Sequence, residues 1–293
     1  MYQVLYNPLS GNGNGKDSAM KIKKLVGDEE VTFVDVTALG SYSDFMANLS
    51  PDDKPVIAGG DGTINQFINK FDTTGYNGKI YYYPAGSGND FMSDVKDTAT
   101  YINDNRDERG YGIIDLTEYI TDLPVVTIKG KDYKFINGIG FGIDGYCCEV
   151  GDKLRKTTTK PINYAGIAIK GLLFHYKSTS ATVTVDGKAE TLSRVWLCPI
   201  MNGRYYGGGM IPTPTQDRKK PNHTLTSMAF MGRSRLKTLI IFPSIFKGEH
   251  VKHTDVVKTF SGKCITVAFD RPVAAQVDGE TILDVSEITA SFR

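Results

Sequence analysis

The sequence predicts a two-domain α/β protein, with an N-terminal, mainly parallel α/β domain and a C-terminal, antiparallel β-rich domain that is sandwich-like. The chain has 293 residues, a length that corresponds to about two domains. Up to Asp115, apolar strand segments alternate with segments of helical periodicity, which is typical of a parallel sheet covered on both faces. After Asp115, β-type segments dominate.

In the first domain we expect strands at Tyr2–Tyr6, Val31–Asp35, 55–58 and 80–83. Apolar residues at helical spacing predict helices between them, around 22–26, 42–49 and 64–69. Gly-rich loops follow three of the strands. Because the carboxyl ends of parallel strands meet at one edge of a sheet, these loops should lie together.

In the second domain we expect strands at Val125–Ile128, 133–137, 181–185, 191–197, 224–228 and 264–269. Asp186-Gly187 is a hairpin signal. One helix, 162–176, should interrupt the strands and face the core, with contact to a membrane as the alternative. Its expected apolar side consists of Ile162, Ala165, Ile169, Leu172, Leu173 and Tyr176.

Composition excludes several classes of protein and of binding partner. With 34 Lys and Arg against 33 Asp and Glu, the net charge is +1, so a nucleic-acid partner selected by bulk electrostatics is not expected. No apolar run reaches the roughly 18 residues of a membrane span, and no basic segment precedes the first strand, so we expect a cytosolic protein. The four cysteines lack paired metal spacing and should be reduced and buried. They are Cys147, Cys148, Cys198 and Cys264.

The three Gly-rich loops predict a phosphate site. Glycines let backbone N–H groups approach an anion, and a helix N-terminus adds unpaired donors. Asp61 is unexpected beside phosphate unless a cation, a donor or a polar substrate group offsets its charge. The alternative is a set of structural turns, with Thr63 or Asp61 as a helix cap. Neither a Walker A loop nor a Rossmann fingerprint is present.

Three motifs in this order and spacing carry a family resemblance: Asn-Pro-Leu-Ser-Gly at 7–11, Gly-Gly-Asp-Gly-Thr-Ile-Asn at 59–65 and Gly-Ser-Gly-Asn-Asp-Phe at 86–91. The chain resembles the catalytic domain of the diacylglycerol kinase family, which includes bacterial lipid kinases and sphingosine and ceramide kinases. The likeness continues through 114–116, 135–142, 201–203, 206–210, 247–250 and 276–280. The second motif alone is also found in NAD kinases and phosphofructokinases.

The resemblance implies ATP and Mg²⁺ as cofactors and a cleft between the domains for nucleotide and lipid. It implies an ATP-binding domain of residues 1–118 plus 285–293, to which the last strand, 288–292, returns, and a lipid-substrate domain of residues 119–284. The residues expected to line the nucleotide are Asn7, Pro8, Ser10, Gly11, Gly59, Gly60, Asp61, Gly62, Thr63, Asn65, Gly86, Ser87 and Asn89, with Thr37 as a weaker candidate.

For catalysis, the resemblance points to Asp278-Gly279-Glu280, one of whose carboxylates would take the proton of the acceptor hydroxyl. Alternation along an extended segment allows only one of the two carboxylates to face the substrate readily. Asp278 is slightly preferred because it precedes the glycine turn. The alternative is a plain Asp-Gly hairpin turn.

The expected metal ligands are Asp61, Asp90, Asp115 and Asp217, and here the sequence departs from the family. Members usually carry an Asp-Asp-Gly turn that helps to hold a structural magnesium, whereas this chain has Asp217-Arg218-Lys219. A guanidinium cannot ligate a cation. Either Asp217 substitutes from the neighbouring position, or Arg218 fills the site as a tethered charge.

We therefore expect an ATP-dependent lipid kinase acting on a lipid alcohol such as diacylglycerol, peripheral at the inner membrane face. The basic clusters 153–156 with Lys160 and 218–220 would contact anionic lipid. The alternatives are a kinase of a soluble hydroxyl compound such as NAD, and an inactive nucleotide- or lipid-binding regulator. A homodimer is left open.

Overall fold

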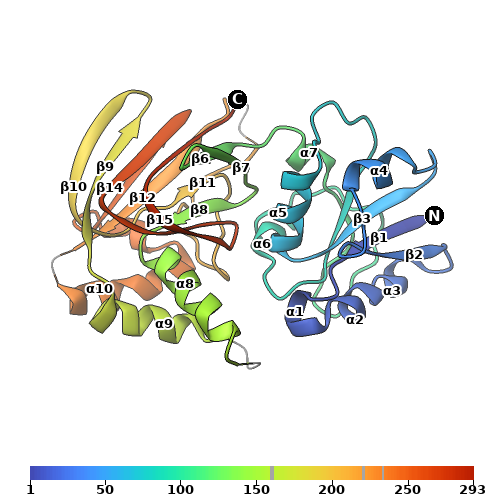
Figure 1. The fold of residues 1–293 in the computed structure, drawn as a ribbon, viewed down its shortest axis with the longest axis horizontal. Coiled ribbons are helices and arrows are strands. Elements are labelled where there is room, and N and C mark those ends of the chain that lie inside the picture. Colours follow the sequence, from blue (N-terminus) through green and yellow to red (C-terminus); the bar gives the residue numbers. More distant parts are fainter. Residues whose placement is uncertain (159–161, 220–221, 233) are drawn as a thin grey trace. The chain divides into compact units, whose positions relative to one another are not determined.

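A computed structural model describes residues 1–158, 162–219, 222–232 and 234–293. The chain divides into two compact units, Met1–Leu123 and Pro124–Arg293 (Figure 1). The division lies five residues after the boundary expected from the sequence. The expected combination of an α/β domain and an antiparallel β-rich domain is confirmed.

The first unit is built on a sheet with the strand order β2-β1-β3-β4-β5. The strands are β1 (Tyr2–Tyr6), β2 (Val31–Asp35), β3 (Lys54–Gly59), β4 (Tyr81–Pro84) and β5 (Ile114–Asp115). All neighbouring pairs are parallel except β4 and β5. The first four strands lie within one residue of their predicted positions, because each is a short apolar run bounded by turn residues.

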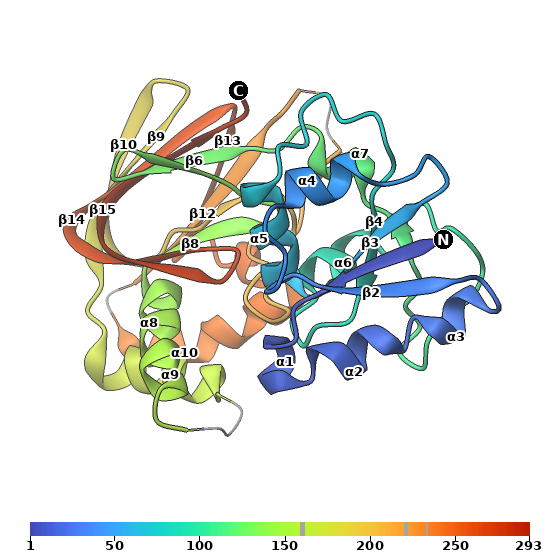
Figure 2. The ribbon, with the colours of Figure 1, turned by 45° about the vertical axis from the view of Figure 1, so that its right-hand side comes forward.

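Seven helices of the first unit are α1 (Ser10–Gly13), α2 (Gly15–Met20), α3 (Lys23–Val26), α4 (Tyr42–Ala47), α5 (Asp61–Lys70), α6 (Asp90–Val95) and α7 (Thr117–Ile120). In Figures 1 and 2, α1 to α3 run along one face of the sheet and α4 and α5 lie on the other. Val4 packs with Ala19, Ile22 and Leu25 in the core of the first of these faces. The helical segment ends before Gly27, whose φ of +62° suits glycine.

The second unit contains the strands β6 (Val125–Ile128), β7 (Lys131–Lys134), β8 (Gly138–Phe141), β9 (Thr179–Val185), β10 (Lys188–Leu197), β11 (Ile200–Met201), β12 (Leu225–Met231), β13 (Val257–Gly262), β14 (Cys264–Val277) and β15 (Glu280–Ser291). Their order is β7-β6-β15-β14-β8-β11-β12-β10-β9, and β9 also pairs with β14. The strands from β14 to β9 therefore close on themselves. The predicted hairpin is confirmed, with Asp186 and Gly187 at φ of +48° and +83° between β9 and β10.

The last strand does not return to the first unit, so this part of the predicted division is wrong. β15 pairs with β14 along most of its length and with β6 through Thr289 to Ser291. The hairpin at Asp278-Gly279 leads directly into it, and this short connection holds β15 beside β14.

The helices of the second unit depart further from expectation. The expected helix 162–176 is observed as α9 (Tyr164–Lys170) and the π-helical turn η1 (Gly171–His175). Ile167, Gly171 and Leu172 are buried in these two elements. Of the expected apolar side, Leu172 and Tyr176 are buried, whereas Ile169 is exposed. The helix α8 (Ile143–Arg155) was not predicted. Nor were α10 (Arg235–Ile241) and the 3₁₀ helices η2 (Phe242–Lys247) and η3 (His250–Lys252).

Two expectations from composition can be compared with the structure. Throughout the part of the chain that is described, no helix is both long and apolar enough to cross a membrane. All four cysteines are free, but Cys264 is exposed, so the expectation that all are buried is wrong. Cys264 is the first residue of β14, and its side chain points away from the core.

Candidate functional site

The three Gly-rich loops of the first unit follow β1, β3 and β4. These strands are parallel neighbours in the sheet. The loops therefore lie at one edge, as the alternation of strands and helices predicted. Each loop leads into a short or medium helix, so helix N-termini gather at the same edge.

The second and third loops pack backbone against backbone. A Cβ atom built on Gly60 would lie 2.4 Å from the carbonyl oxygen of Gly88, and one on Gly86 would lie 2.3 Å from the amide nitrogen of Gly60. The Asp61 amide donates to the Gly88 carbonyl oxygen at 3.1 Å. Glycine is thus required at 60 and 86 by the close approach of the loops to each other.

Asp61 joins the same two loops through its side chain. Its carboxylate accepts the backbone N–H of Asp90 at 2.8 Å and that of Phe91 at 3.0 Å, which are the first two amides of α6. A carboxylate at a helix N-terminus is stabilised by these donors and by the helix dipole. The charge of Asp61 in a phosphate-type loop is therefore offset by donors of the chain itself, one of the three alternatives that the sequence left open.

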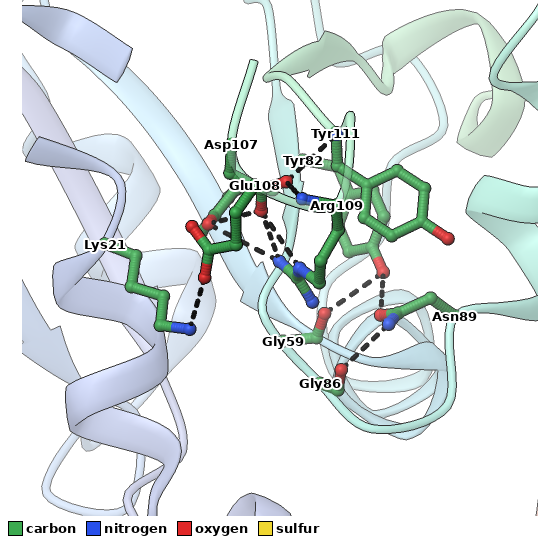
Figure 3. A network of polar contacts seen from close by, with 10 residues as sticks. Lys21, Gly59, Tyr82, Gly86, Asn89, Asp107, Glu108, Arg109 and Tyr111 are labelled. Atoms are coloured by element: carbon green, nitrogen blue, oxygen red, sulfur yellow. Dashed lines mark hydrogen bonds and ion pairs between the residues drawn. The ribbon is translucent and has the colours of Figure 1, made fainter. Parts of the chain in front are cut away.

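Tyr82 is a site residue that the sequence analysis missed. Its buried hydroxyl donates to the Gly59 carbonyl oxygen at 3.0 Å and lies 3.3 Å from Asn89 Oδ1, while Asn89 Nδ2 donates to the Gly86 carbonyl oxygen (Figure 3). Burial raises the pKa of Tyr82 well above its usual value, so the phenol stays a donor. The Tyr82 hydroxyl thus holds both loops in place through its hydrogen bonds to Gly59 and Asn89. Only the strand position of Tyr82, at the end of an apolar run, could have suggested this.

The first loop is ordered by its own residues. Asn7 Oδ1 accepts the Leu9 amide at 2.9 Å, and the Ser10 hydroxyl donates to the Asn7 carbonyl oxygen at 2.8 Å. Thr37 follows β2, the neighbour of β1, and both its amide and its hydroxyl donate to Asp35 Oδ1. Asn7, Ser10 and Thr37 therefore lie after adjacent strands.

The charged loop formed by residues 107–111 of the first unit was also not predicted from the sequence. Arg109 donates to Asp107 Oδ2 through Nε at 3.0 Å and through Nη2 at 2.6 Å, and Lys21 forms an ion pair with Glu108 (Figure 3). Burial alone would raise the pKa of Asp107, but hydrogen bonds from Arg109 and from the Tyr111 amide outweigh it and lower the pKa. Asp107 is thus a charged anchor that holds residues 107–111 in one conformation.

In the second unit, Asp278 occupies a hairpin turn and also binds a distant segment. Asp278 and Gly279 have φ of +45° and +97°, as a two-residue hairpin requires. The Asp278 carboxylate accepts the backbone N–H groups of Ile136, Asn137 and Gly138 at 2.6, 2.9 and 3.0 Å. The residue is therefore both the plain hairpin turn and an anchor for the segment before β8.

Glu280 has a different environment from Asp278. It is the first residue of β15, pairs with Val277 across the hairpin and is exposed, whereas Asp278 is 9% exposed. The three amides occupy three of the roughly four acceptor positions of the Asp278 carboxylate. Glu280 is therefore the more accessible of the two carboxylates.

The expected metal ligands do not gather. Among the residues that the structure describes, no group of three or more His, Cys, Asp or Glu side chains could hold a metal ion. Asp61 binds the amides of α6, Asp115 pairs with Lys79 at 3.1 Å, and Asp217 Oδ1 accepts the Lys219 amide. These residues do not fit a magnesium ion held by the protein alone.

Arg218 is bound to the segment that precedes β8. Its guanidinium donates to the Ile136 carbonyl oxygen at 2.9 Å and to Asn137 Oδ1 at 3.2 Å. Asp217, by contrast, is exposed. Arg218 is thus a tethered positive charge on the same segment whose amides bind Asp278.

A buried acid, Asp144, was also not predicted. It lies in the first turn of α8 and accepts the Tyr206 hydroxyl at 3.1 Å. Burial raises the pKa of Asp144 to about 6, although the Gly145 amide, Tyr206 and Gln276 favour the ionised form and offset part of the effect. The folded state therefore holds a proton on Asp144 at a pH at which the unfolded chain has lost it.

This pKa predicts a pH-dependent stability. The contribution of Asp144 is fully present below its ordinary pKa of 3.8 and is lost as the pH rises through about 6. We expect the free energy of unfolding to fall by about 3 kcal/mol from this group between about pH 4 and about pH 7, and Asp144→Asn to remove that fall. Urea denaturation of both proteins across this range measures it. An unchanged slope in the variant would contradict the environment described for Asp144.

The comparisons with known proteins agree with this arrangement. Residues 1–106 match the family described as diacylglycerol kinase catalytic domain, and residues 137–290 match the family described as YegS C-terminal NAD kinase beta sandwich-like domain. The chain belongs to the diacylglycerol kinase family. The family resemblance inferred from the sequence motifs is thereby confirmed, and membership indicates a phosphotransferase of the lipid-kinase type.

Individual relatives support the same family. The diacylglycerol kinase of Mycobacterium tuberculosis (strain ATCC 25618 / H37Rv) is 27% identical over 276 residues, which cover 90% of this chain and 84% of the relative. A crystal structure of a diacylglycerol kinase from Bacillus anthracis str. Sterne has a TM-score of 0.58 at 14% identity and covers 99% of this chain and 93% of that one. The latter likeness shows the two-domain fold.

Proposed function

We propose that this protein is an ATP-dependent lipid kinase that transfers the γ-phosphate of ATP to the hydroxyl of a membrane lipid, with diacylglycerol as the first candidate. The observation that carries the proposal is the bracing of two Gly-rich loops by Asp61 and Tyr82 at the carboxyl edge of the sheet. Such bracing preorganises the backbone for an anion. The name of the M. tuberculosis relative supports the choice of lipid.

The phosphates would lie over the start of α5. The amides of Thr63 and Ile64 both donate to the Gly60 carbonyl oxygen, and the Asp61 amide donates to Gly88. Gly62 lies between them, and a Cβ atom built on it meets nothing within 4 Å. We assign the Gly62 amide and the open space beside it to phosphate, with Asn7 and Ser87 as further donors. Mg²⁺ would arrive with ATP and neutralise its oxygens.

Glu280 would accept the proton of the lipid hydroxyl during attack on the γ-phosphate. Asp278 would hold the hairpin, because its carboxylate binds three amides of the segment 136–138. Transfer moves one phosphoryl group from ATP to the alcohol oxygen, leaving ADP and a phosphorylated lipid. The enzyme would meet its lipid at the inner face of the membrane as a peripheral protein.

A panel of acceptors with γ-labelled ATP tests this proposal. It contains diacylglycerol, sphingosine, ceramide and NAD, each with ATP and Mg²⁺, and the label is followed into each product. We expect the label to enter diacylglycerol fastest. Label in NAD alone would replace the lipid with a soluble acceptor, and ATP binding without transfer to any acceptor would favour a regulator that has lost catalysis.

A further inference from the structure

Several large apolar side chains of the second unit are exposed to solvent instead of being packed in its core. Five large side chains of α9, η1, α10 and η2 are exposed: Ile169 at 47%, Phe174 at 72%, Leu236 at 64%, Ile240 at 70% and Phe246 at 47%. We call these five residues the apolar face. η1 contacts both α9 and α10, and α10 contacts η2. Figures 1 and 2 both show α9 and α10 close together beneath the strands of this unit.

The helix α10 shows why this surface needs an explanation. Thr238 and Ile241 point inward, and Ile241 belongs to the core. Leu236 and Ile240, four residues apart, lie on the opposite side and face solvent. A surface helix is normally polar on its outer side, so a helix that is apolar on both sides indicates a partner for the outer side.

The charges of the same segments indicate the kind of partner. Residues 162–185 and 229–248 contain no Asp or Glu. The cations on or beside these elements are Lys170, Lys177, Arg235, Lys237 and Lys247. Lys237 pairs with Asp255, and Arg235 donates to the Leu172 carbonyl oxygen, which leaves Lys170, Lys177 and Lys247 as the cations nearest the apolar side chains with no ion pair among the described residues. Apolar side chains flanked by such cations match the composition of a surface that lies on an anionic bilayer. A second copy of the chain would place these cations against one another, which disfavours a symmetric dimer through this face.

We propose that the apolar face is a membrane-docking surface that inserts into anionic bilayers. The proposal rests on the proposed function, because a kinase without a spanning helix in its described residues must reach a lipid dissolved in a membrane. It moves the main contact away from the basic cluster expected from the sequence. In that cluster Lys153 pairs with Glu149, Arg155 pairs with Asp152, and Lys160 lies outside the described residues. In the other expected cluster, Arg218 is bound inward and Lys220 lies outside the described residues.

The test is co-sedimentation of the full chain with vesicles of phosphatidylglycerol and with vesicles of phosphatidylcholine. We expect stronger binding to phosphatidylglycerol and weaker binding at high salt. Phe174→Gln combined with Ile240→Gln should lower binding by about tenfold or more, because two large apolar side chains no longer enter the bilayer. Met20→Gln is the matched control, since Met20 is 41% exposed on α2 of the first unit and should not change binding.

Activity separates this proposal from the proposed function. The double variant should lose phosphorylation of diacylglycerol in vesicles and keep it on a dispersed short-chain diacylglycerol. A parent that binds vesicles through this face but phosphorylates neither form supports the docking surface and contradicts the kinase. Unchanged vesicle binding in the double variant would overturn the docking surface. So would a loss confined to Lys153→Gln, Arg155→Gln and Lys156→Gln, or a parent dimer that becomes monomeric in the double variant with vesicle binding unaltered.

Discussion

We expect Glu280→Gln to lower the turnover of the enzyme by about a hundredfold or more, while its affinity for ATP stays near that of the parent. The amide keeps the size of the side chain but cannot accept the proton of the lipid hydroxyl. Glu280 is exposed at the start of β15, so the substitution should leave the free energy of unfolding almost unchanged. Initial rates with saturating ATP, together with calorimetric ATP titration, measure both parts of the prediction.

Asp278→Asn is the comparison variant on the same hairpin. An amide in this position presents a donor toward at least one of the N–H groups of Ile136, Asn137 and Gly138, which the carboxylate now accepts. We expect the free energy of unfolding to fall by about 1–3 kcal/mol, and the activity to fall with it. A folded, inactive Asp278→Asn beside a fully active Glu280→Gln would place the base at Asp278.

We expect Gly60→Val to abolish measurable ATP binding and to lower the stability of the first unit. A Cβ atom at Gly60 lies 2.4 Å from the Gly88 carbonyl oxygen, so a side chain would push apart the two loops that Asp61 and Tyr82 hold together. The loss of stability comes from the collision of the added side chain with the backbone of the other loop, for which the cost is about 1–3 kcal/mol or more.

Gly62→Val tests the effect of a side chain on phosphate binding without disturbing the packing of the loops. Nothing lies within 4 Å of a Cβ atom at Gly62 or at Gly40, and neither has a positive φ. We expect Gly62→Val to keep the stability of the parent and to weaken ATP binding by about tenfold or more, whereas Gly40→Val, outside the three loops, should change neither. Thermal unfolding and ATP titration of the three variants give the result. Parental ATP affinity in Gly62→Val would remove the start of α5 from the phosphate site.

Local pattern was sufficient for the first unit because its strands and helices follow one another along the chain. The runs that became β1, β2, β3 and β4 are apolar and bounded by turn residues, so periodicity located them. The three loops could be placed at one edge for the same reason. Their bracing could not be predicted, since Asp61 reaches Asp90 and Phe91, which are about thirty residues away, only through the fold.

The second unit depends more on distant contacts. The helix α8 contains Gly145 and Gly151, which have low helix propensity, and the structure shows why they are there. A Cβ atom on Gly145 would lie 1.9 Å from the Ala274 carbonyl oxygen, and one on Gly151 would lie 2.7 Å from the ring of Tyr164. Packing therefore overrides propensity in α8. In the same way, the pairing of β15 with β14 and β6, and the three amides bound by Asp278, arise from residues far apart in the sequence.

The most direct test of the central proposal is transfer of the γ-phosphate of labelled ATP to diacylglycerol in phosphatidylglycerol vesicles, with the parent and Glu280→Gln side by side. We predict that the parent forms labelled phosphatidic acid and ADP in equal amounts. The variant should bind ATP normally but form both products at a rate lower by about a hundredfold or more. Normal ATP binding by the parent without labelled lipid would contradict the account, and so would equal rates of labelled lipid formation in the two proteins.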